Sequence, residues 1–223
     1  MKNKILLLTA FLTLTALFQP SYALAEEKTA VITQNERSQY QPFSREVYYN
    51  NCVIVYPKED RGGYIIASGI ASEAMKNSKI SIQILKDSEA TKESLQSKNV
   101  IVIGNIAINS FIKELESKLP VKLTADSLRV GTKSYDKDYG VSFIYPNLYN
   151  PVNKMIFIMA NSENALKMPD FKGYDLAVTK GINEILPFQF KEVANGKYDE
   201  KWNLKEVEEI SAKLLQTGEN EKV

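Results

Sequence analysis

The first constraint on chemistry is a residue type that the chain lacks. None of the 223 residues is histidine. A Ser-His-Asp triad, a Cys-His pair and a histidine-ligated metal site therefore cannot be built from this sequence. Serine, lysine, the carboxylates and one cysteine remain, and among these a pair of carboxylates can hydrolyse glycosides without histidine. Catalysis, if the chain performs any, must rest on one of these groups.

Glycines follow two predicted strands but match no phosphate-binding motif. Gly62 and Gly63 come after an apolar run and a polar loop, and Gly104 ends the run NVIVIG. A helix N-terminus after such a turn can hold an anion, yet neither stretch fits G-x-G-x-x-G or the P-loop pattern. Ser68 lies inside a helical pattern and not in a G-x-S-x-G elbow. The glycines are therefore predicted to form tight turns and not a nucleotide site. Serine catalysis is disfavoured, and no cofactor is predicted.

One acidic stretch begins like a calcium-binding loop. It runs Asp136-Lys-Asp138-Tyr-Gly140. It lacks the third acidic position, and Asn147 stands at the twelfth place, where a calcium loop needs a bidentate glutamate. A polar turn between two strands is the favoured interpretation, and no metal site is predicted.

The N-terminus predicts a secretory signal peptide over residues 1–25. Two lysines precede an uncharged run over residues 5–18, and Ala23-Leu24-Ala25 supplies a small-x-small cleavage site. The alternative is an uncleaved N-terminal anchor. We expect a flexible lead-in over 26–44, a single α/β domain over 45–217 and a tail over 218–223. The predicted location is secreted or periplasmic, with no membrane association after cleavage.

Charge and cysteine content narrow the class of protein further. Lys and Arg number 28 against 27 Asp and Glu, a formal net charge of +1. A general nucleic-acid binder needs a basic surface, so no nucleic-acid partner is predicted. The only cysteine, Cys52, cannot form an internal disulfide. It adjoins an apolar run, which favours a small buried side chain over a nucleophile.

Local patterns predict an alternation of strands and helices in the first half of the chain. Apolar runs predict strands at 53–56, 80–85 and 99–104, and helical spacing predicts helices over 64–75, 91–96 and 109–119. Further strands are expected at 121–125, 127–130, 140–145, 154–159, 175–179 and 186–192. A last helix is expected after Asn203, with Leu204, Val207, Ile210 and Leu214 on its apolar face. The predicted fold is α/β: a three-layer flavodoxin-like or Rossmann-like sheet, mostly parallel, with an antiparallel hairpin addition.

Candidate binding residues follow from that topology. Open α/β sheets bind ligands beyond the carboxyl ends of their strands. Arg61, Asn105 and Asn147 follow three predicted strands, which would bring them towards one edge. Asn150 shares the tyrosine-containing segment IYPNLYNPVN with Asn147, a composition suited to recognition of sugar or peptide. The alternative is that these asparagines fix turns by bonding their own backbone. No catalytic residue is assigned.

Several segments, taken in order, carry a resemblance. They are NVIVIGNIAINSFIKELESKLPVKL, LRVGTKSYDKDYGVSFIYPNLYNP, KMIFIMANS, MPDFKGYDLAV and VANGKYDEKWNL. Together they resemble the carboxyl-terminal flavodoxin-like α/β module of secreted bacterial α/β-hydrolase proteins of the predicted esterase/peptidase type. The family usually has Gly-Asn-Pro where this chain has Gly104-Asn105-Ile106. The family also usually has the motif Pro-Asn-Pro-Leu-Asn-Pro, and at that place this chain has Pro146-Asn147-Leu148-Tyr149-Asn150-Pro151. The resemblance implies a layered sheet and a triad that belongs to a separate catalytic domain, which has no counterpart in this sequence.

These observations lead to three functional hypotheses. The first is an exported, non-catalytic α/β module that binds a protein partner or an extracellular or cell-surface polymer. The second is a small secreted hydrolase that works without histidine. The third is an accessory subunit that completes a separate hydrolase chain. A catalytic domain encoded in a neighbouring gene would favour the third.

Overall fold

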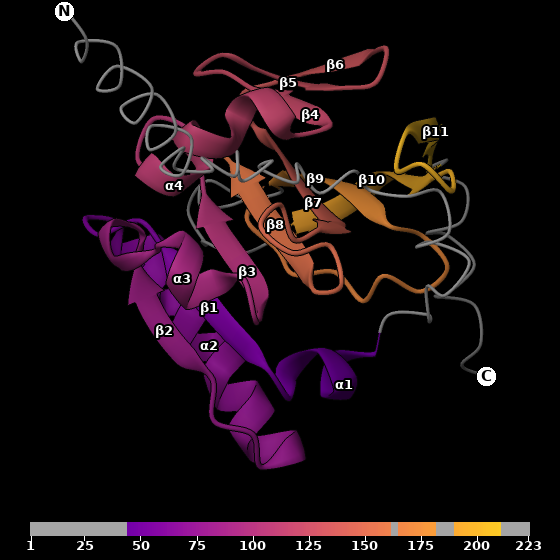
Figure 1. Ribbon diagram of the computed structural model, residues 1–223. Helices are drawn as coiled ribbons and strands as arrows, with labels where there is room; N and C mark the ends of the chain where they lie inside the picture. The colour runs from indigo at the N-terminus through magenta and orange to yellow at the C-terminus, as the bar shows by residue number, and fades with distance from the viewer. Residues whose placement is uncertain (1–43, 162–164, 182–189, 211–223) are drawn as a thin grey trace, which may run out of the picture. The chain divides into compact units, whose positions relative to one another are not determined.

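A computed structural model describes residues 44–161, 165–181 and 190–210 of the chain (Figure 1). The predicted signal peptide, the lead-in except Ser44, the predicted strand at 186–189 and the tail lie outside these residues. None of the helices within the described ranges is both long and apolar enough to span a membrane.

The first half of the chain forms the predicted strands and helices. Its strands are β1 (Cys52–Tyr56), β2 (Gln83–Lys86) and β3 (Asn99–Gly104). Its helices are α1 (Arg45–Tyr49), α2 (Arg61–Ser78), α3 (Lys92–Leu95) and α4 (Ser110–Leu115), with 3-10 turns η1 (Asp87–Glu89) and η2 (Glu116–Lys118). Asp60, Thr91 and Asn109 cap α2, α3 and α4 by accepting a hydrogen bond from a backbone amide of the first turn. The helices predicted over 64–75, 91–96 and 109–119 are thus present, with α4 shorter than expected.

The second half of the chain contains strands in place of further strand–helix units. They are β7 (Tyr139–Pro146), β8 (Lys154–Ala160), β9 (Leu176–Gly181), β10 (Phe190–Tyr198) and β11 (Leu204–Glu209). The eight-stranded sheet has the order β11-β10-β9-β7-β8-β3-β1-β2 (Figure 1). Pairs among β2, β1, β3 and β8 are parallel, whereas β7, β9, β10 and β11 pair antiparallel with their neighbours.

The prediction of a mostly parallel, three-layer flavodoxin-like or Rossmann-like sheet is therefore wrong. The sheet is mixed, and antiparallel pairs make up its larger part. The physical reason lies in the connections: only residues 147–153 separate β7 from β8, and only residues 199–203 separate β10 from β11. A parallel pair needs a crossover of a dozen or more residues, so these links allow antiparallel pairing only.

The predicted last helix is also wrong, because Leu204–Glu209 forms strand β11 against β10. The Asp199 side chain accepts hydrogen bonds from the amides of Lys201 and Asn203, which closes a tight turn before β11. Asn203 thus belongs to a hairpin turn and does not cap a helix. The spacing of Leu204 and Val207 suits a helix in isolation, and pairing with a neighbouring strand overrides it.

Each face of the main sheet is covered by an apolar cluster. On one face, α1 and α2 pack through Tyr48, Ala67 and Ile70 against isoleucines of β1, β3 and β8. On the other face, α3 and α4 pack on the valines of β1 and β3. Val100, Ile101, Val102 and Ile103 are all fully buried. The strand predicted at 99–104 is confirmed, and it is an interior strand covered on both faces.

A second sheet contributes to one of these clusters. It consists of β4 (Val121–Leu123), β5 (Ser127–Val130) and β6 (Lys133–Asp136), all antiparallel. Leu128 and Val130 join the cluster that holds α3 and α4. After β6, the Asp136 carboxylate accepts a hydrogen bond from the amide of Asp138, which confirms a polar turn between two strands. The described residues contain no group of three or more potential metal-ligating Cys, Asp or Glu side chains.

Candidate functional site

The candidate site is the edge formed by the carboxyl ends of β1, β2 and β3. The chain passes from β1 to β2 on one side and then to β3 on the other, so the connections diverge at this edge. Ligand crevices in open α/β sheets form where connections diverge in this way. Here the protein's own side chains fill the point of divergence. Gly104 has φ +121°, and a Cβ on it would lie 2.6 Å from Cγ of Pro57.

Asp87 holds this edge together. Its side chain is 8% exposed, and it accepts hydrogen bonds from the amide of Lys58 and from both the amide and the hydroxyl of Ser110. These contacts join the loop after β1, the turn after β2 and the start of α4. Burial by itself raises the pKa of the Asp87 carboxyl, but the bonds from Ser110, Lys58 and Ser88 outweigh it and lower the pKa below its ordinary value.

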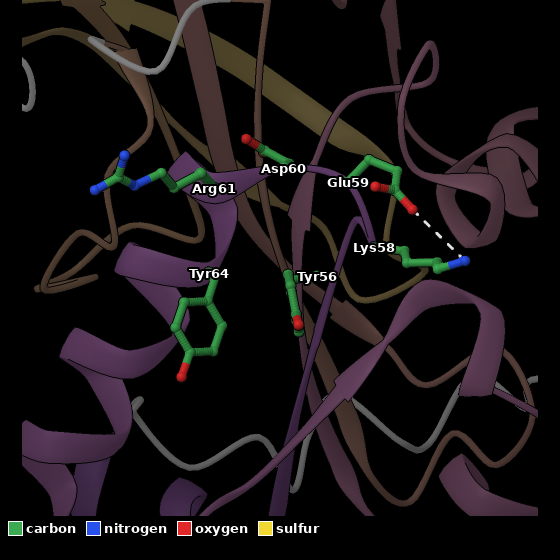
Figure 2. A pocket seen from close by; sticks show the side chains of 6 residues that line it. All are labelled: Tyr56, Lys58, Glu59, Asp60, Arg61 and Tyr64. Carbon is green, nitrogen blue, oxygen red and sulfur yellow. Dashed lines mark ion pairs between the residues drawn. The ribbon is translucent and has the colours of Figure 1, made fainter.

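Six residues line an open depression of about 340 Å³ at this edge (Figure 2): Tyr56, Lys58, Glu59, Asp60, Arg61 and Tyr64. The rings of Tyr56 and Tyr64 lie 5.4 Å apart between their centroids, and Tyr64 is 50% exposed. Lys58 and Glu59 form an exposed ion pair of 3.5 Å. Figure 2 shows Arg61 extending away from that ion pair, with Asp60 between them and the side chains of Tyr56 and Tyr64 lower in the view. We call Tyr56, Lys58, Glu59, Arg61 and Tyr64 the edge surface.

Asp60 lines the depression, but its carboxylate serves the helix. One carboxylate oxygen accepts a hydrogen bond of 3.0 Å from the amide of Gly62 in the first turn of α2. A Cβ at Gly63 would lie 2.8 Å from the other oxygen, so a larger residue at position 63 would push against the Asp60 cap. These contacts explain the glycine at position 63 by local packing, without a bound phosphate. Asp60 is therefore a helix cap within the site.

Asn105 also lies at this edge, where it organises the turn after β3. Its Oδ1 accepts hydrogen bonds from the amides of Ala107 and Ile108, and its Nδ2 donates to the carbonyl of Ala160 at the end of β8. Asn109 is fully buried, and its Nδ2 donates to the carbonyl of Ile103 while its Oδ1 caps α4. Both side chains thus make the contacts of turn-fixing asparagines.

Asn147 and Asn150 lie at the opposite edge of the sheet, contrary to the expected convergence with Arg61 and Asn105. Because β7 runs antiparallel to β8, Pro146 pairs with Lys154 at the amino end of β8. Asn147 is 1% exposed, and its Nδ2 donates to the carbonyls of Leu95 and Lys98. Only Arg61 and Asn105 are brought to a common edge. A binding role for any of the four residues remains a prediction.

Cys52 sits at the start of β1, away from the carboxyl edge. Its side chain is 7% exposed, and burial raises the pKa of its thiol far above the ordinary value. A thiol in this state is a poor nucleophile at neutral pH. The prediction of a buried side chain is confirmed.

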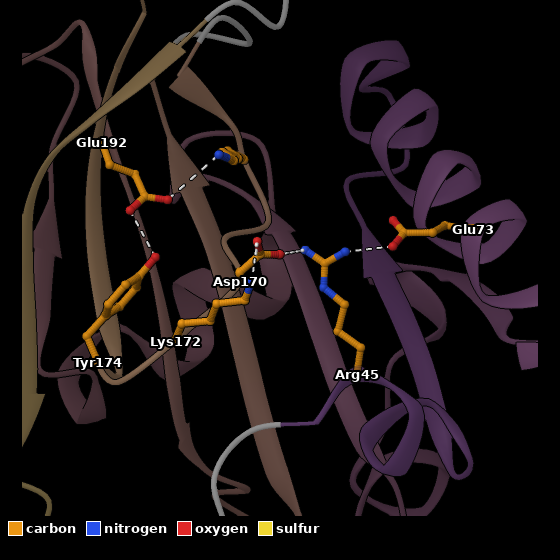
Figure 3. Close-up of polar contacts among 7 residues, drawn as sticks. Arg45, Glu73, Asp170, Lys172, Tyr174 and Glu192 are labelled. Carbon is orange, nitrogen blue, oxygen red and sulfur yellow. Dashed lines mark hydrogen bonds and ion pairs between the residues drawn. The ribbon is translucent and has the colours of Figure 1, made fainter. Parts of the chain in front are cut away.

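A second polar cluster lies over the face that carries α1 and α2 (Figure 3). The Arg45 guanidinium pairs with Glu73 at 2.6 Å and with Asp170 at 2.7 Å. Farther along, the Tyr174 hydroxyl donates to Glu192 at 2.9 Å. The groups in the ion pairs are between a fifth and nine-tenths exposed, so each pair contributes at most about 1 kcal/mol. The cluster fastens α1 to α2 and to the segment before β9.

Sequence reasoning missed Asp87, Tyr56 and Tyr64 as parts of the edge. Tyr56 ends a predicted strand and Tyr64 begins a predicted helix, so their proximity follows once β1 and α2 pack together. Asp87 gave only the weak signal of an acidic residue after a strand. Comparison with family models and with curated proteins finds no match for this chain.

Proposed function

We propose that this chain is an exported, non-catalytic module that binds a protein partner through the edge surface. The observation that carries the proposal is the Tyr56–Tyr64 pair, open to solvent beside Arg61 and the Lys58–Glu59 ion pair. Tyrosine and arginine are the side chains that most often supply binding energy at protein interfaces. Such residues on an open, shallow surface suit a protein partner better than a small substrate, which needs an enclosing pocket.

The polar groups around the edge surface support binding over catalysis. Asp60 caps α2, Asp87 accepts three hydrogen bonds from Lys58 and Ser110, and Asn105 is committed to its turn. A general acid or base must be available to a substrate atom. Carboxylates already engaged by backbone amides meet that need poorly. The resemblance to a module that accompanies a catalytic domain supports the same proposal.

The proposal can be tested by crosslinking from a chosen position. Glu59→Cys introduces a surface thiol that can carry a photo-activated benzophenone, because Glu59 lines the depression and its side chain is 86% exposed. The variant keeps Tyr56, Arg61 and Tyr64, and buried Cys52 stays unlabelled. The labelled protein is introduced into the host's export compartment, irradiated, and its adducts are identified by mass spectrometry. The matched control is Val152→Cys, because Val152 is 80% exposed and lies near Asn150 at the opposite edge.

We expect one protein to be crosslinked from position 59 and not from position 152. Arg61→Ala should lower the yield of that adduct. Equal products from both positions, or none from position 59, would contradict the proposal. In parallel, the purified protein should leave ester, peptide and glycan substrates unchanged. Turnover of any of them, lost on mutation of a carboxylate at the edge, would favour the histidine-independent hydrolase instead.

A further inference from the structure

We infer that the groove between α2 and strand β2 binds an extended, apolar peptide segment with acidic residues, by adding a strand to the sheet. This groove is separate from the edge surface. The inference therefore stands or falls independently of the proposed function. It rests on the position of β2, on the shape of the groove and on its charge.

Strand β2 is an edge strand of the eight-stranded sheet, at the opposite side from β11. Within the described ranges it pairs with β1 alone, so its outer side has no strand neighbour there. Gln83 is exposed, and Ile84 and Leu85 are half-buried. The amide of Lys86 is engaged, since it donates to Glu89 at 2.9 Å. A strand with one unpaired side offers a row of amides and carbonyls to a second chain.

A hollow beside this strand can take a side chain of the added segment. It has a volume of about 480 Å³ and is lined by Ser68, Ala71, Ser72, Met75, Lys76 and Ile84. Residues 68, 72 and 75 recur at helical spacing on one side of α2, where short side chains leave the hollow open. Met75 is 46% exposed.

The charge around the hollow selects an acidic occupant. Lys76 is the only charged side chain that lines it. The segment from Ala74 to Ile82 carries Lys76 and Lys79 and no acidic residue. Two carboxylates of these segments are engaged elsewhere: Glu73 of α2 pairs with Arg45, and Glu89 in the turn η1 after β2 accepts a hydrogen bond from the amide of Lys86. Among the described residues Lys76 forms no ion pair, and a lysine in this state beside an apolar hollow favours a partner whose apolar side chains are flanked by carboxylates.

Two capped hexapeptides test this inference. The probe is Val-Glu-Ile-Glu-Val-Glu, and its matched control replaces each glutamate by lysine. Each peptide is titrated into the isotope-labelled wild-type protein. Amide chemical shifts and amide hydrogen exchange are then followed by NMR. We expect the acidic probe alone to shift amides of Gln83–Leu85 and of the lining of the hollow, and to slow hydrogen exchange along β2.

Variants at Lys76 decide whether the charge acts as argued. Lys76→Glu should weaken binding of the acidic hexapeptide by about tenfold and Lys76→Gln by less. The matched control is Lys113→Glu, because Lys113 is exposed in the last turn of α4, on the other face of the sheet. It should leave binding unchanged. Melting temperatures show that each variant is folded.

Four results would overturn the inference. They are equal binding of the basic hexapeptide, shifts confined to residues away from β2 and the hollow, unchanged binding by Lys76→Glu, and a concentration-dependent dimer that Lys76→Glu abolishes. The last would assign the groove to a second copy of the chain. A loss of edge-surface crosslinking would leave all four tests unaffected.

Discussion

Replacement of Asn147 by alanine tests whether this asparagine is a structural residue. Its side chain makes three hydrogen bonds of 2.9 Å: two from Nδ2 to the carbonyls of Leu95 and Lys98, and one from the amide of Tyr149 to Oδ1. The side chain is almost completely buried at 1% exposure. Alanine removes all three bonds and leaves a cavity that polar backbone atoms surround.

The expected cost follows from which groups lose their partner. The carbonyl of Leu95 also accepts a hydrogen bond from the amide of Lys98, so it stays partly satisfied. The carbonyl of Lys98 and the amide of Tyr149 lose the contact outright. Each unsatisfied buried group costs about 1–3 kcal/mol. The bonds to Lys98 and from Tyr149 are only part-buried, so each of these two losses lies towards the lower end of that range. We therefore expect Asn147→Ala to lower the free energy of unfolding by about 2–3 kcal/mol.

Chemical denaturation with global fitting measures this loss, and a fall in melting temperature of about 5–10 °C should accompany it. Asn150→Ala is the matched control. Asn150 accepts one long bond of 3.3 Å from the amide of Val152, and we expect a loss below about 1 kcal/mol. A loss below about 0.5 kcal/mol for Asn147→Ala would refute the structural role. If that variant were stable and also lost its partner, the binding hypothesis for Asn147 would be correct.

Three other predictions concern the core, pH dependence and export. Val102→Asp should unfold the protein, because Val102 is fully buried between β1 and β8; a melt within a few degrees of wild type would contradict this. Folding lowers the pKa of the Asp87 carboxyl, so this carboxyl stabilises the folded protein fully above its unfolded pKa of about 3.9. That stabilisation is lost as the pH falls through the folded pKa. Asp87→Asn should remove this acid dependence from the denaturation curves. The intact mass of the exported protein, measured by mass spectrometry, should correspond to a chain that begins at Glu26. A mature form that retains Met1 would contradict cleavage after Ala25.

Local sequence patterns were sufficient for the parallel part of the sheet. Asn99–Gly104 is apolar on successive residues, which requires cover on both faces. Helix α2 is marked by apolar residues at helical spacing, and Thr91 and Asn109 stand where helix caps belong. These features depend on residues close together in sequence, so one sequence contains the whole signal.

Strand direction and the last element required information that local patterns lack. The pattern of Tyr139–Pro146 suits a parallel or an antiparallel strand equally, and the short link at 147–153 decides between them. Leu204 and Val207 fit a helix or a strand, and the Asp199 turn with β10 decides. The error at β7 also moved Asn147 to the wrong edge in the predicted site. Tyr56, Arg61 and Tyr64 meet through packing, so their grouping could be found only from the fold.

The affinity of the purified protein for the partner crosslinked at position 59 tests the central claim most directly. We predict that Tyr64→Ala and Arg61→Ala each raise the Kd by at least about tenfold, as expected for interface residues worth more than about 1.4 kcal/mol. Val152→Ala, at the opposite edge, should leave the Kd unchanged. A Kd that none of the three variants alters would show that the edge surface does not bind the partner.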